Sequence, residues 1–472
     1  MIMPKPHLIA KSSFPLLIML LLAAALSIAQ LPNIPPKIPL PQEILRPQEM
    51  RVLPGALDQV PVFNSNSPEL VLNEGILLST FPKAQKSFAN AHLDRSFTGR
   101  FDLFTHHIAK GSAEDLRTLY EGIIVYNPTA EPVTLDILQA ASYVSQPDAP
   151  FIEMPSVVEN PIGNVYAGPG SRAVSDVLRG RRQEVFPASI TIASKQYGML
   201  LNLPIPVKTL VPPVNGRSTL MRVRSSGGVY VASLALFAKM DASGQERAPS
   251  LAEWQGLLQT GQLSTPRDKV PTPIEQKTGS LIYGRVAGVA IGSRWQAQVT
   301  DPGKSTLATP PMGGAFSYGI SLLHRGTLGT KQNQSAKMEV RYPDTAYQAH
   351  GNYGIEYNLT LPLENQSASM QTVTVSMETP LKREDTQKGL RFFEPLPKSV
   401  FFRGTVRVRA TDDAGIAKTR YVHLVQRRGQ MGEPLVTMKL KPKEKRLVQV
   451  DLIYPPDATP PQVLTVQTIA DP

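Results

Sequence analysis

Short runs of alternating apolar and polar residues, bounded by proline or glycine, are the feature that most limits how this chain can fold. The run at residues 133–137 alternates directly after a turn at residues 127–132, and similar runs recur along most of the sequence. A period of two gives a strand one apolar face, and the short turns between runs favour antiparallel pairing. Together with 44 prolines and 33 glycines in 472 residues, the pattern predicts an all-β protein.

One segment departs from this pattern and reads as a helix. In PSLAEWQGLLQTG, Ser250 precedes an apolar stripe and Glu253 follows three residues later, which is a capping box, and Gly261 ends the run. A proline-rich stretch follows, and 472 residues exceed what one hydrophobic core usually supports. We therefore predict two antiparallel β-sandwich domains of the immunoglobulin-like type, residues 61–248 and 279–472, joined by a short helical and proline-rich segment at 249–278.

The two halves resemble each other in three segments that occur in the same order. The segment at Asn127 aligns with that at Asn365, the strand at Ile192 with that at Leu440, and VPPVNG with YPPDAT, at offsets of about 240 residues. Self-similarity at a constant spacing is typical of a duplicated structural unit. Chance likeness between two strand-rich segments is the alternative interpretation.

The N-terminus predicts export. Two lysines precede the uncharged apolar run FPLLIMLLLAAALSI, and small residues end it, so residues 1–29 read as a cleaved signal peptide. The run is shorter than the roughly 20 residues that span a bilayer, and an uncleaved anchor is the alternative. Residues 30–60, with seven prolines between Pro32 and Pro54, are expected to form an extended leader.

The chain has no cysteine and carries a formal charge of +11. Disulfides, thiol nucleophiles and lipid attachment through cysteine are therefore excluded, and we expect neither a metal nor a cofactor. Between Lys382 and Leu447 there are 17 lysines and arginines against seven acidic residues, so the second domain is the basic one. In an exported protein this charge favours anionic polysaccharide, wall polymer or lipid headgroups over nucleic acid, and a solvated basic face is the alternative.

The stretch RYPDTAYQAHGNYGIEY, residues 341–357, concentrates four of the 14 tyrosines with polar side chains. Tyrosine faces stack on sugar rings while polar groups bond the hydroxyls, so this is a candidate carbohydrate site. The alternative is a packed loop that caps one end of a sandwich, because the matching region around His106 in the first half is also aromatic. The candidate ligand-binding residues are Tyr342, Asp344, Tyr347, His350, Asn352 and Tyr353.

Basic residues suggest a second kind of site, for anions. One group follows the glycine-rich segment YAGPGS and the others lie near the C-terminus, although none matches a phosphate-binding motif. The candidate anion-binding residues are Arg172, Arg179, Arg181, Arg182, Arg427, Arg428, Lys439 and Lys441. Motifs of serine hydrolases and zinc proteases are absent, so no catalytic residue is predicted.

The segments EGIIVYNPTAEPVTLDILQAASYVSQPDAPF, RYPDTAYQAHGNYGIEY and TRYVHLVQRRGQMGEPLVT resemble those of an uncharacterised cyanobacterial family of exported proteins, domain of unknown function 3370. The likeness covers nearly the whole mature chain. It implies a protein of the periplasm, the outer envelope surface or the extracellular space, and it brings no activity, cofactor or site residue to carry over.

We therefore expect a non-catalytic cell-envelope protein that binds anionic polysaccharide or cell-wall material, with no membrane span after signal cleavage. A structural or assembly factor that binds another envelope protein is the first alternative. A carbohydrate-active enzyme is the second, since paired carboxylates of a glycosidase are close in space rather than in sequence.

Overall fold

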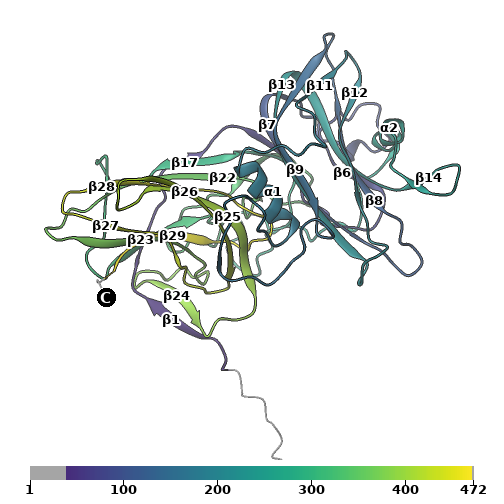
Figure 1. The fold of residues 1–472 in the computed structure, drawn as a ribbon. Coiled ribbons are helices and arrows are strands. Elements are labelled where there is room, and N and C mark those ends of the chain that lie inside the picture. The colour runs from purple at the N-terminus through teal and green to yellow at the C-terminus, as the bar shows by residue number, and fades with distance from the viewer. Residues whose placement is uncertain (1–38, 470–472) are drawn as a thin grey trace, which may run out of the picture. The chain divides into compact units, whose positions relative to one another are not determined.

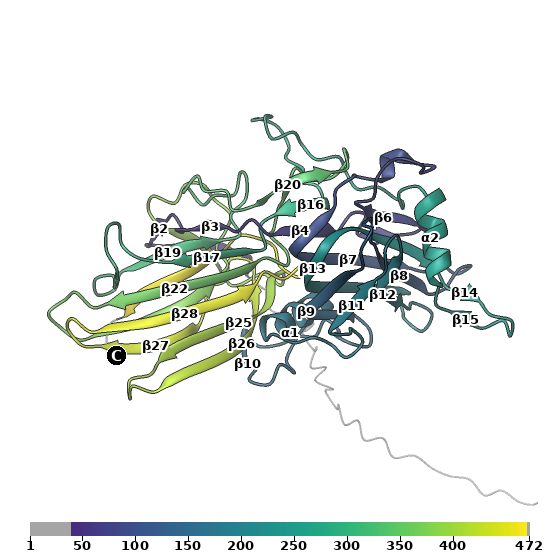
Figure 2. The ribbon, with the colours of Figure 1, turned by 90° about the horizontal axis from the view of Figure 1, so that it is seen from above.

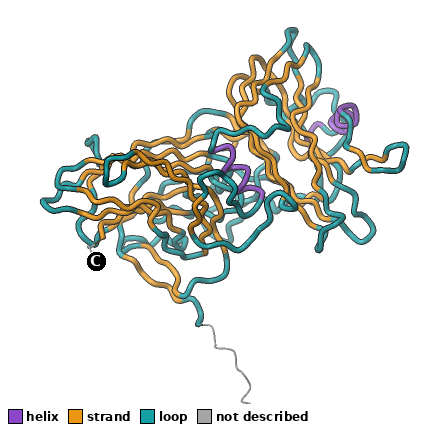
Figure 3. Tube along the Cα trace, in the orientation of Figure 1, coloured by secondary structure: helices purple, strands orange, loops and turns teal. Residues whose placement is uncertain are grey.

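Strands make up nearly all the regular structure of residues 39–469, the part of the chain that the computed structural model describes (Figure 3). In this range there are 29 strands, two α-helices and one short 3-10 turn, η1 (Ala89–Ala91). The all-β prediction is confirmed. The predicted signal peptide and the start of the predicted leader lie outside the described residues.

The largest sheet has twelve strands and is drawn mainly in purple to teal in Figure 1. Its main path follows the order β11-β9-β13-β7-β4-β16-β20-β21, and β5, β6, β8 and β12 join it at the sides. In chain order its strands are β4 (Pro61–Ser65), β5 (Leu70–Val71), β6 (Gly75–Ser79), β7 (Phe97–Lys110), β8 (Leu119–Tyr126), β9 (Val133–Val144), β11 (Ser189–Ile192), β12 (Tyr197–Ile205), β13 (Val214–Phe237), β16 (Ala287–Ile291), β20 (Ala336–Arg341) and β21 (Gln348–Ala349).

The 24-residue strand β13 belongs to two layers of this sheet. Its first half pairs with β7 and β9, and its second half pairs with β6 and β8. The register against β7 shifts between Ser225 and Val229, where Gly227 and Gly228 remove side chains from the bend. One strand thus covers both sides of a core that includes Phe101, Ile123 and Val231.

An eight-stranded and a five-stranded sheet pack around one core in the second half of the chain, drawn in green and yellow in Figure 2. The eight-stranded sheet holds β3 (Ala56–Leu57), β10 (Val157–Glu159), β17 (Arg294–Gln298), β18 (Leu307–Ala308), β22 (Glu356–Glu364), β25 (Val400–Thr411), β26 (Ala417–Arg427) and β28 (Lys445–Ile453). The five-stranded sheet holds β2 (Glu49–Arg51), β19 (Ala315–Ile320), β23 (Gln371–Glu378), β27 (Pro434–Leu440) and β29 (Gln462–Ile469). The two remaining pairs are β1 (Gln42–Arg46) with β24 (Leu390–Glu394), and β14 (Lys239–Met240) with β15 (Glu246–Arg247).

Strand order and hydrogen bonds repeat between the halves. The order β11-β9-β13-β7 in the first half corresponds to β27-β23-β29-β19 in the second, and every pair in both series is antiparallel. The Asn127 amide donates to the carbonyl of Ile192 (3.0 Å), and the Asn365 amide donates to the carbonyl of Leu440 (2.9 Å). Each asparagine also accepts a hydrogen bond from the backbone N–H two residues on. The predicted correspondence of these two pairs of residues is confirmed.

The two helices have different surroundings. Helix α2 (Leu251–Thr260) begins at Ser250 with the predicted capping box and buries Trp254, whose ring lies against Gly122, where a Cβ atom would clash at 2.6 Å. Helix α1 (Pro169–Leu178) starts with proline at its first position and packs against β9 and β13 on one side and β25 and β28 on the other. Neither is long and apolar enough to cross a membrane, and the described residues contain no other α-helix.

Pairing also crosses the predicted domain limits. Strands β16, β20 and β21 continue the sheet of β4 and β7, and β10 pairs with β26. Residues 42–57, part of the predicted extended, proline-rich leader at 30–60, contain β1, β2 and β3, which pair with β24, β19 and β17. Proline spacing does not prevent this, because each strand fits between two prolines. Pro41–Pro472 form one compact unit.

A buried group of charges lies where these pairings meet. The Glu356 carboxylate accepts hydrogen bonds from Arg222 (2.7 Å), on β13, and from Arg294 (3.0 and 3.1 Å), on β17. Arg222 also faces the carboxylate of Asp102 at 3.9 Å. Ion pairs therefore join strands of the first half to strands of the second, with Arg222 and Glu356 buried and Arg294 44% exposed.

Candidate functional site

Three adjoining depressions lie along residues 455–461, the connection between β28 and β29. The central one has a volume of about 840 Å³ and its neighbours have volumes of about 660 and 390 Å³. Thr459 lines all three, Tyr353 lines the central and the 660 Å³ depressions, and Lys382 lines the central and the 390 Å³ depressions. Because the walls are shared, the three form one groove, which we call the junction groove.

The local sequence explains why this connection lines a groove instead of extending a strand. In PPDATPP, residues 455–461, four of seven residues are prolines, which have no N–H to donate to a neighbouring strand. The connection is held instead by the bond from the Thr459 N–H to the carbonyl of Phe401 (2.7 Å). Pro456, Asp457, Thr459 and Pro460 of this connection line the groove, whereas Pro455 is buried.

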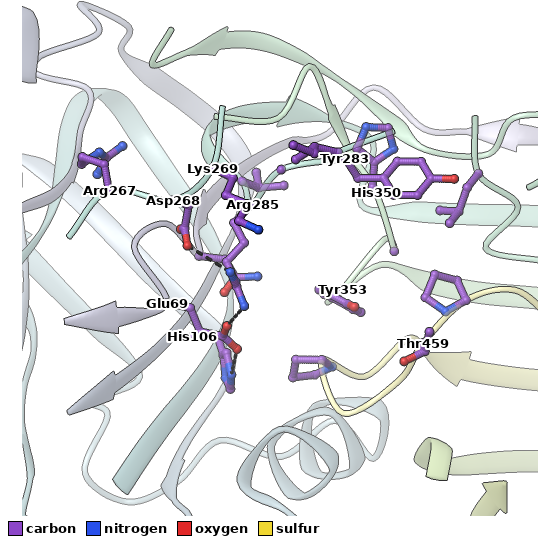
Figure 4. Close-up of a pocket in the computed structure, with 18 of the residues that line it drawn as sticks. Glu69, His106, Arg267, Asp268, Lys269, Tyr283, Arg285, His350, Tyr353 and Thr459 are labelled. Atoms are coloured by element: carbon purple, nitrogen blue, oxygen red, sulfur yellow. Dashed lines mark hydrogen bonds and ion pairs between the residues drawn. The ribbon is translucent and has the colours of Figure 1, made fainter. Parts of the chain in front are cut away.

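One wall of the central depression carries a chain of alternating charges (Figure 4). The His106 ring lies 3.5 Å from the carboxylate of Glu69, which also forms an ion pair with Arg285, and Arg285 lies 3.0 Å from Asp268. The bond with His106 and the charge of Arg285 hold the pKa of Glu69 below its usual value. Glu69 is therefore ionised at neutral pH.

Aromatic rings form the opposite wall, where Figure 4 shows Tyr283 beside His350. Their ring centres are 4.7 Å apart, and the Lys382 ammonium lies 5.0 Å from the Tyr283 ring. Burial and the nearby cations lower the pKa of His350 to about 4, so its imidazole is neutral, and its Nδ1 atom has no partner among the described residues. The wall is thus a flat, mainly apolar surface, and the unpaired Nδ1 atom of His350 is buried behind it.

Tyr353 lies between the central and the 660 Å³ depressions. Its hydroxyl donates to the carbonyl of Ala458 (2.9 Å), and its ring stacks on Tyr454 with ring centres 6.2 Å apart. Burial raises the pKa of Tyr353 to about 12, so the hydroxyl stays protonated. Both contacts fix the ring as part of the groove floor.

Cations outnumber acidic residues in the groove. The cations are Arg267, Lys269, Arg285, Lys382, Arg383, Arg403 and Arg428, and the acidic residues are Glu43, Glu69, Asp268 and Asp457. Lys269 and Lys382 form no ion pair among the described residues, and burial lowers the pKa of Lys382. The groove therefore presents a positive excess to a ligand.

Asp457 differs from the other acidic residues. Its carboxylate accepts the backbone N–H of Ser171 in the first turn of α1 (2.7 Å). Burial nevertheless raises the pKa of Asp457 to about 6. The 660 Å³ depression thus contains one ionised carboxylate, Glu69, and one, Asp457, that titrates close to neutrality.

The six predicted ligand residues are divided between the groove and the interior. His350 and Tyr353 line the groove. Tyr342 is 0% exposed, and its hydroxyl donates to the carbonyl of Ala91 (2.8 Å) and accepts the N–H of Ser79 (3.0 Å). Asn352 is also buried.

The Asn352 side chain bonds to the backbone of Gln334 and Ala336 and to the hydroxyl of Tyr357. Burial favours a raised pKa for Asp344, but the bidentate pair with Arg267 outweighs it and lowers the pKa. The Tyr347 ring is covered by the Arg341 guanidinium at 3.8 Å. The stretch is thus mainly packing, with one edge in the groove.

The predicted anion-binding residues lie in three separate places. Four surround α1, where Arg172 stacks on Tyr143 and Tyr166, Arg179 stacks on Tyr421, Arg181 pairs with Asp176, and Arg182 donates to the carbonyl of Ile137. Arg427 ends β26 and Arg428 lines the 390 Å³ depression of the groove. Lys439, on β27 of the five-stranded sheet, and Lys441, just after that strand, lie near the β25–β26 turn, where the backbone N–H of Lys439 donates to Asp413.

Several groove residues carry no sequence signal that marks them as functional. Glu69, Asp268, Tyr283 and Arg285 lie in unremarkable loops, and Asp457 reads as part of a turn. The sequence signal was the alignment of residues 341–357 with the region around His106 in the internal repeat. The structure brings His106, His350 and Tyr353 into one groove.

The comparisons with known proteins identify a family. No curated protein matches this chain. The profile of one family matches residues 48–468, which is almost the entire described range. The chain therefore belongs to the family described as Protein of unknown function (DUF3370).

Proposed function

We propose that the protein is exported to the cell envelope and binds an anionic polysaccharide or wall polymer in the junction groove without catalysing a reaction on it. We further propose that it is built of two immunoglobulin-like sandwiches. The repeated strand order supports this arrangement, with β10, β16, β20 and β21 exchanged between the two sandwiches.

The size and form of the groove support a polymer as ligand. The central depression alone, at about 840 Å³, lies within the range of ligand pockets. The depressions on either side of it extend the contact surface beyond one sugar ring. A chain of several residues would use all three, whereas a single small molecule would leave two empty.

The lining supports a carbohydrate with negative charges. Tyr283 and Tyr353 line the central depression and offer ring faces for stacking. Lys269 and Lys382 supply charges that no protein carboxylate neutralises within 4 Å among residues 39–469. The single observation that carries the proposal is this combination of stacking surface and uncompensated cations in one extended groove.

The test is affinity electrophoresis in gels that contain polygalacturonate, with neutral dextran as the comparison polymer. Lys382→Gln is compared with Lys388→Gln, which removes the same charge outside the groove. Tyr283→Ala is compared with Tyr347→Ala, which removes a ring that Arg341 already covers. We expect polygalacturonate to retard the protein, and Lys382→Gln and Tyr283→Ala each to weaken this at least tenfold.

The two control variants should behave as the unmodified protein does. Equal retardation by dextran would contradict the role of charge. If Lys382→Gln and Lys388→Gln weaken retardation by polygalacturonate equally, the polymer does not bind in the groove.

A carbohydrate-active enzyme is the second candidate, because one depression holds two carboxyl groups in unlike environments. Glu69 is kept ionised while Asp457 titrates near pH 6, a combination that acid–base hydrolysis of glycosides uses. Release of reducing ends from polygalacturonate that is lost in Asp457→Asn would support this candidate and contradict a binding protein.

A further inference from the structure

Five turns meet at the end of the second-half sheets that lies far from the groove, at the left of Figure 2. They connect β17 to β18, β18 to β19, β22 to β23, β25 to β26 and β27 to β28. We call residues 301–306, 310–314, 364–371, 411–418 and 439–447 the distal turns. Strand β28 separates them from residues 455–461 of the groove by eight residue steps, which is about 26 Å.

Hydrogen bonds hold the distal turns together as one surface. Thr306 donates to Glu364 (2.6 Å), which joins the first turn to the third. The Lys443 N–H donates to the carbonyl of Asn365 (2.8 Å), which joins the third to the fifth. Asp413 accepts the N–H of Lys439 (3.0 Å), which joins the fourth to the fifth. The side chains they display are therefore presented in fixed relation to one another.

Every acidic residue in the distal turns forms a salt bridge within the protein, although two of them share Arg446. The pairs are Asp301 with Arg51, Glu364 with Lys445, Asp412 with Lys418, and both Asp413 and Glu444 with Arg446, at 2.6 to 3.8 Å. Four lysines form no salt bridge among the described residues, and with Arg51 the turns hold eight basic residues against five acidic ones, an excess of three positive charges. The four lysines are Lys304, Lys439, Lys441 and Lys443.

Large apolar side chains are exposed on the same turns. Met312 is 53% exposed, Met370 48% and Ile416 53%. Met370 shares a depression of about 430 Å³ with Lys439, Lys441 and Lys443. Exposed apolar side chains beside lysines without salt bridges are complementary to a partner whose outer layer is negatively charged and whose interior is apolar.

We propose that the distal turns dock the protein on an anionic lipid bilayer. The lysines lie against headgroup phosphates, and the three apolar side chains enter the boundary between headgroups and acyl chains. Charge complementarity selects this partner, because the anionic bilayer offers a continuous negative surface to the lysines that the joined turns display. The groove is left free at the other end of β28, so docking and polymer binding are separate activities.

The test is co-sedimentation of the full chain with vesicles of pure phosphatidylcholine and with vesicles of equal parts phosphatidylcholine and phosphatidylglycerol. The variant Lys439→Gln/Lys441→Gln/Lys443→Gln is compared with Lys83→Gln/Lys110→Gln/Lys208→Gln, which removes the same charge from exposed positions in the first half. A second variant, Met370→Ser/Ile416→Ser, removes apolar surface without changing charge. All five altered distal side chains are exposed, so the fold is not at risk.

We expect binding only to the vesicles with phosphatidylglycerol. The distal triple variant should bind them about a hundredfold more weakly, because each lysine near an anionic surface contributes roughly a fivefold gain in affinity. The control triple variant should bind nearly as the unmodified protein does, and Met370→Ser/Ile416→Ser should lose affinity even at low salt.

Three results would overturn the proposal. The first is the absence of vesicle binding, and the second is equal binding to both vesicle types. The third is an equal loss in the two triple variants, which would assign binding to net charge alone. Polygalacturonate retention that depends on the distal lysines, without vesicle binding, would reassign the surface to a polymer.

Discussion

Replacing Glu356 by glutamine tests whether the buried ion pairs make the two halves unfold together. The carboxylate is 5% exposed and accepts three hydrogen bonds, one from Arg222 and two from Arg294. Glutamine keeps the volume but removes the charge, which leaves the buried Arg222 without its closest counter-ion. Breaking a buried pair from one side costs about 3–5 kcal/mol of unfolding free energy.

The size of the cooperative unit converts that cost into a shift of Tm. Unfolding entropy is about 2.1 cal/mol/K per residue, so a unit of roughly 430 residues has about 0.9 kcal/mol/K. A loss of about 4 kcal/mol then lowers Tm by about 4 °C if the whole unit melts at once. If only one half melts, the same loss lowers Tm by about 9 °C.

Differential scanning calorimetry measures both Tm and the number of transitions. Glu339→Gln is the control, since Glu339 pairs with Arg95 at 2.9 Å but is 43% exposed, and exposed pairs contribute about 0–1 kcal/mol. A shift for Glu356→Gln no larger than that of Glu339→Gln would refute the reasoning. Burial favours a raised pKa for Glu356, but the two arginines outweigh it and lower the pKa. Its stabilisation should therefore be present at neutral pH and be lost as the pH falls below about 4.

Three further predictions concern single side chains. Tyr342→Phe leaves the N–H of Ser79 and the carbonyl of Ala91 unpaired, so the free energy of unfolding, measured with urea, should fall by about 1–3 kcal/mol. Retention of this variant in polygalacturonate gels should stay unchanged. Weaker retention would show that Tyr342 contacts the ligand. The pKa of Asp457 in the folded protein is raised to about 6, so ionisation of its carboxyl destabilises the fold as the pH rises from about 4 to 6. Asp457→Asn should therefore raise the free energy of unfolding at pH 7 by up to about 3 kcal/mol and leave it unchanged at pH 3. Parallel curves of stability against pH for the variant and the unmodified protein would contradict this. Arg182→Gln should leave retention in polygalacturonate gels unchanged, because its guanidinium binds a carbonyl inside the protein, and a loss of retention would place an anion site beside α1.

Local patterns in the sequence predicted local structure well. Helix α2 could be predicted because Ser250 and Glu253 cap it through contacts within three residues. The correspondence of Asn127 with Asn365 could be predicted because each asparagine organises its own turn through bonds to residues two and four positions away. Such contacts depend on the order of neighbouring residues, which the sequence displays directly.

The junction groove could not be predicted in the same way. Its walls come from Glu69, His106, Asp268, Tyr283 and residues 455–461, which only the long-range pairing of β4 with β16 and of β28 with β22 brings together. The sequence also could not distinguish the roles of the tyrosines. Tyr342 and Tyr353 occur in one stretch, but Tyr342 is buried and Tyr353 lines the groove. The direction of a side chain in an irregular loop is decided by tertiary packing, and a loop has no hydrophobic periodicity from which that direction could be predicted.

The pairing of β1, β2 and β3 sets an order on how this chain reaches its native state. These strands are synthesised before the other described strands, yet Gln42 of β1 pairs with Glu394 of β24, some 350 residues later, and β2 and β3 pair with β19 and β17. Loops of this length close slowly, because contacts far apart in sequence are formed only after much chain entropy has been lost. Strands β1, β2 and β3 therefore pair only after residues far along the chain have been made, and a chain truncated before residue 390 should leave β1 without its partner.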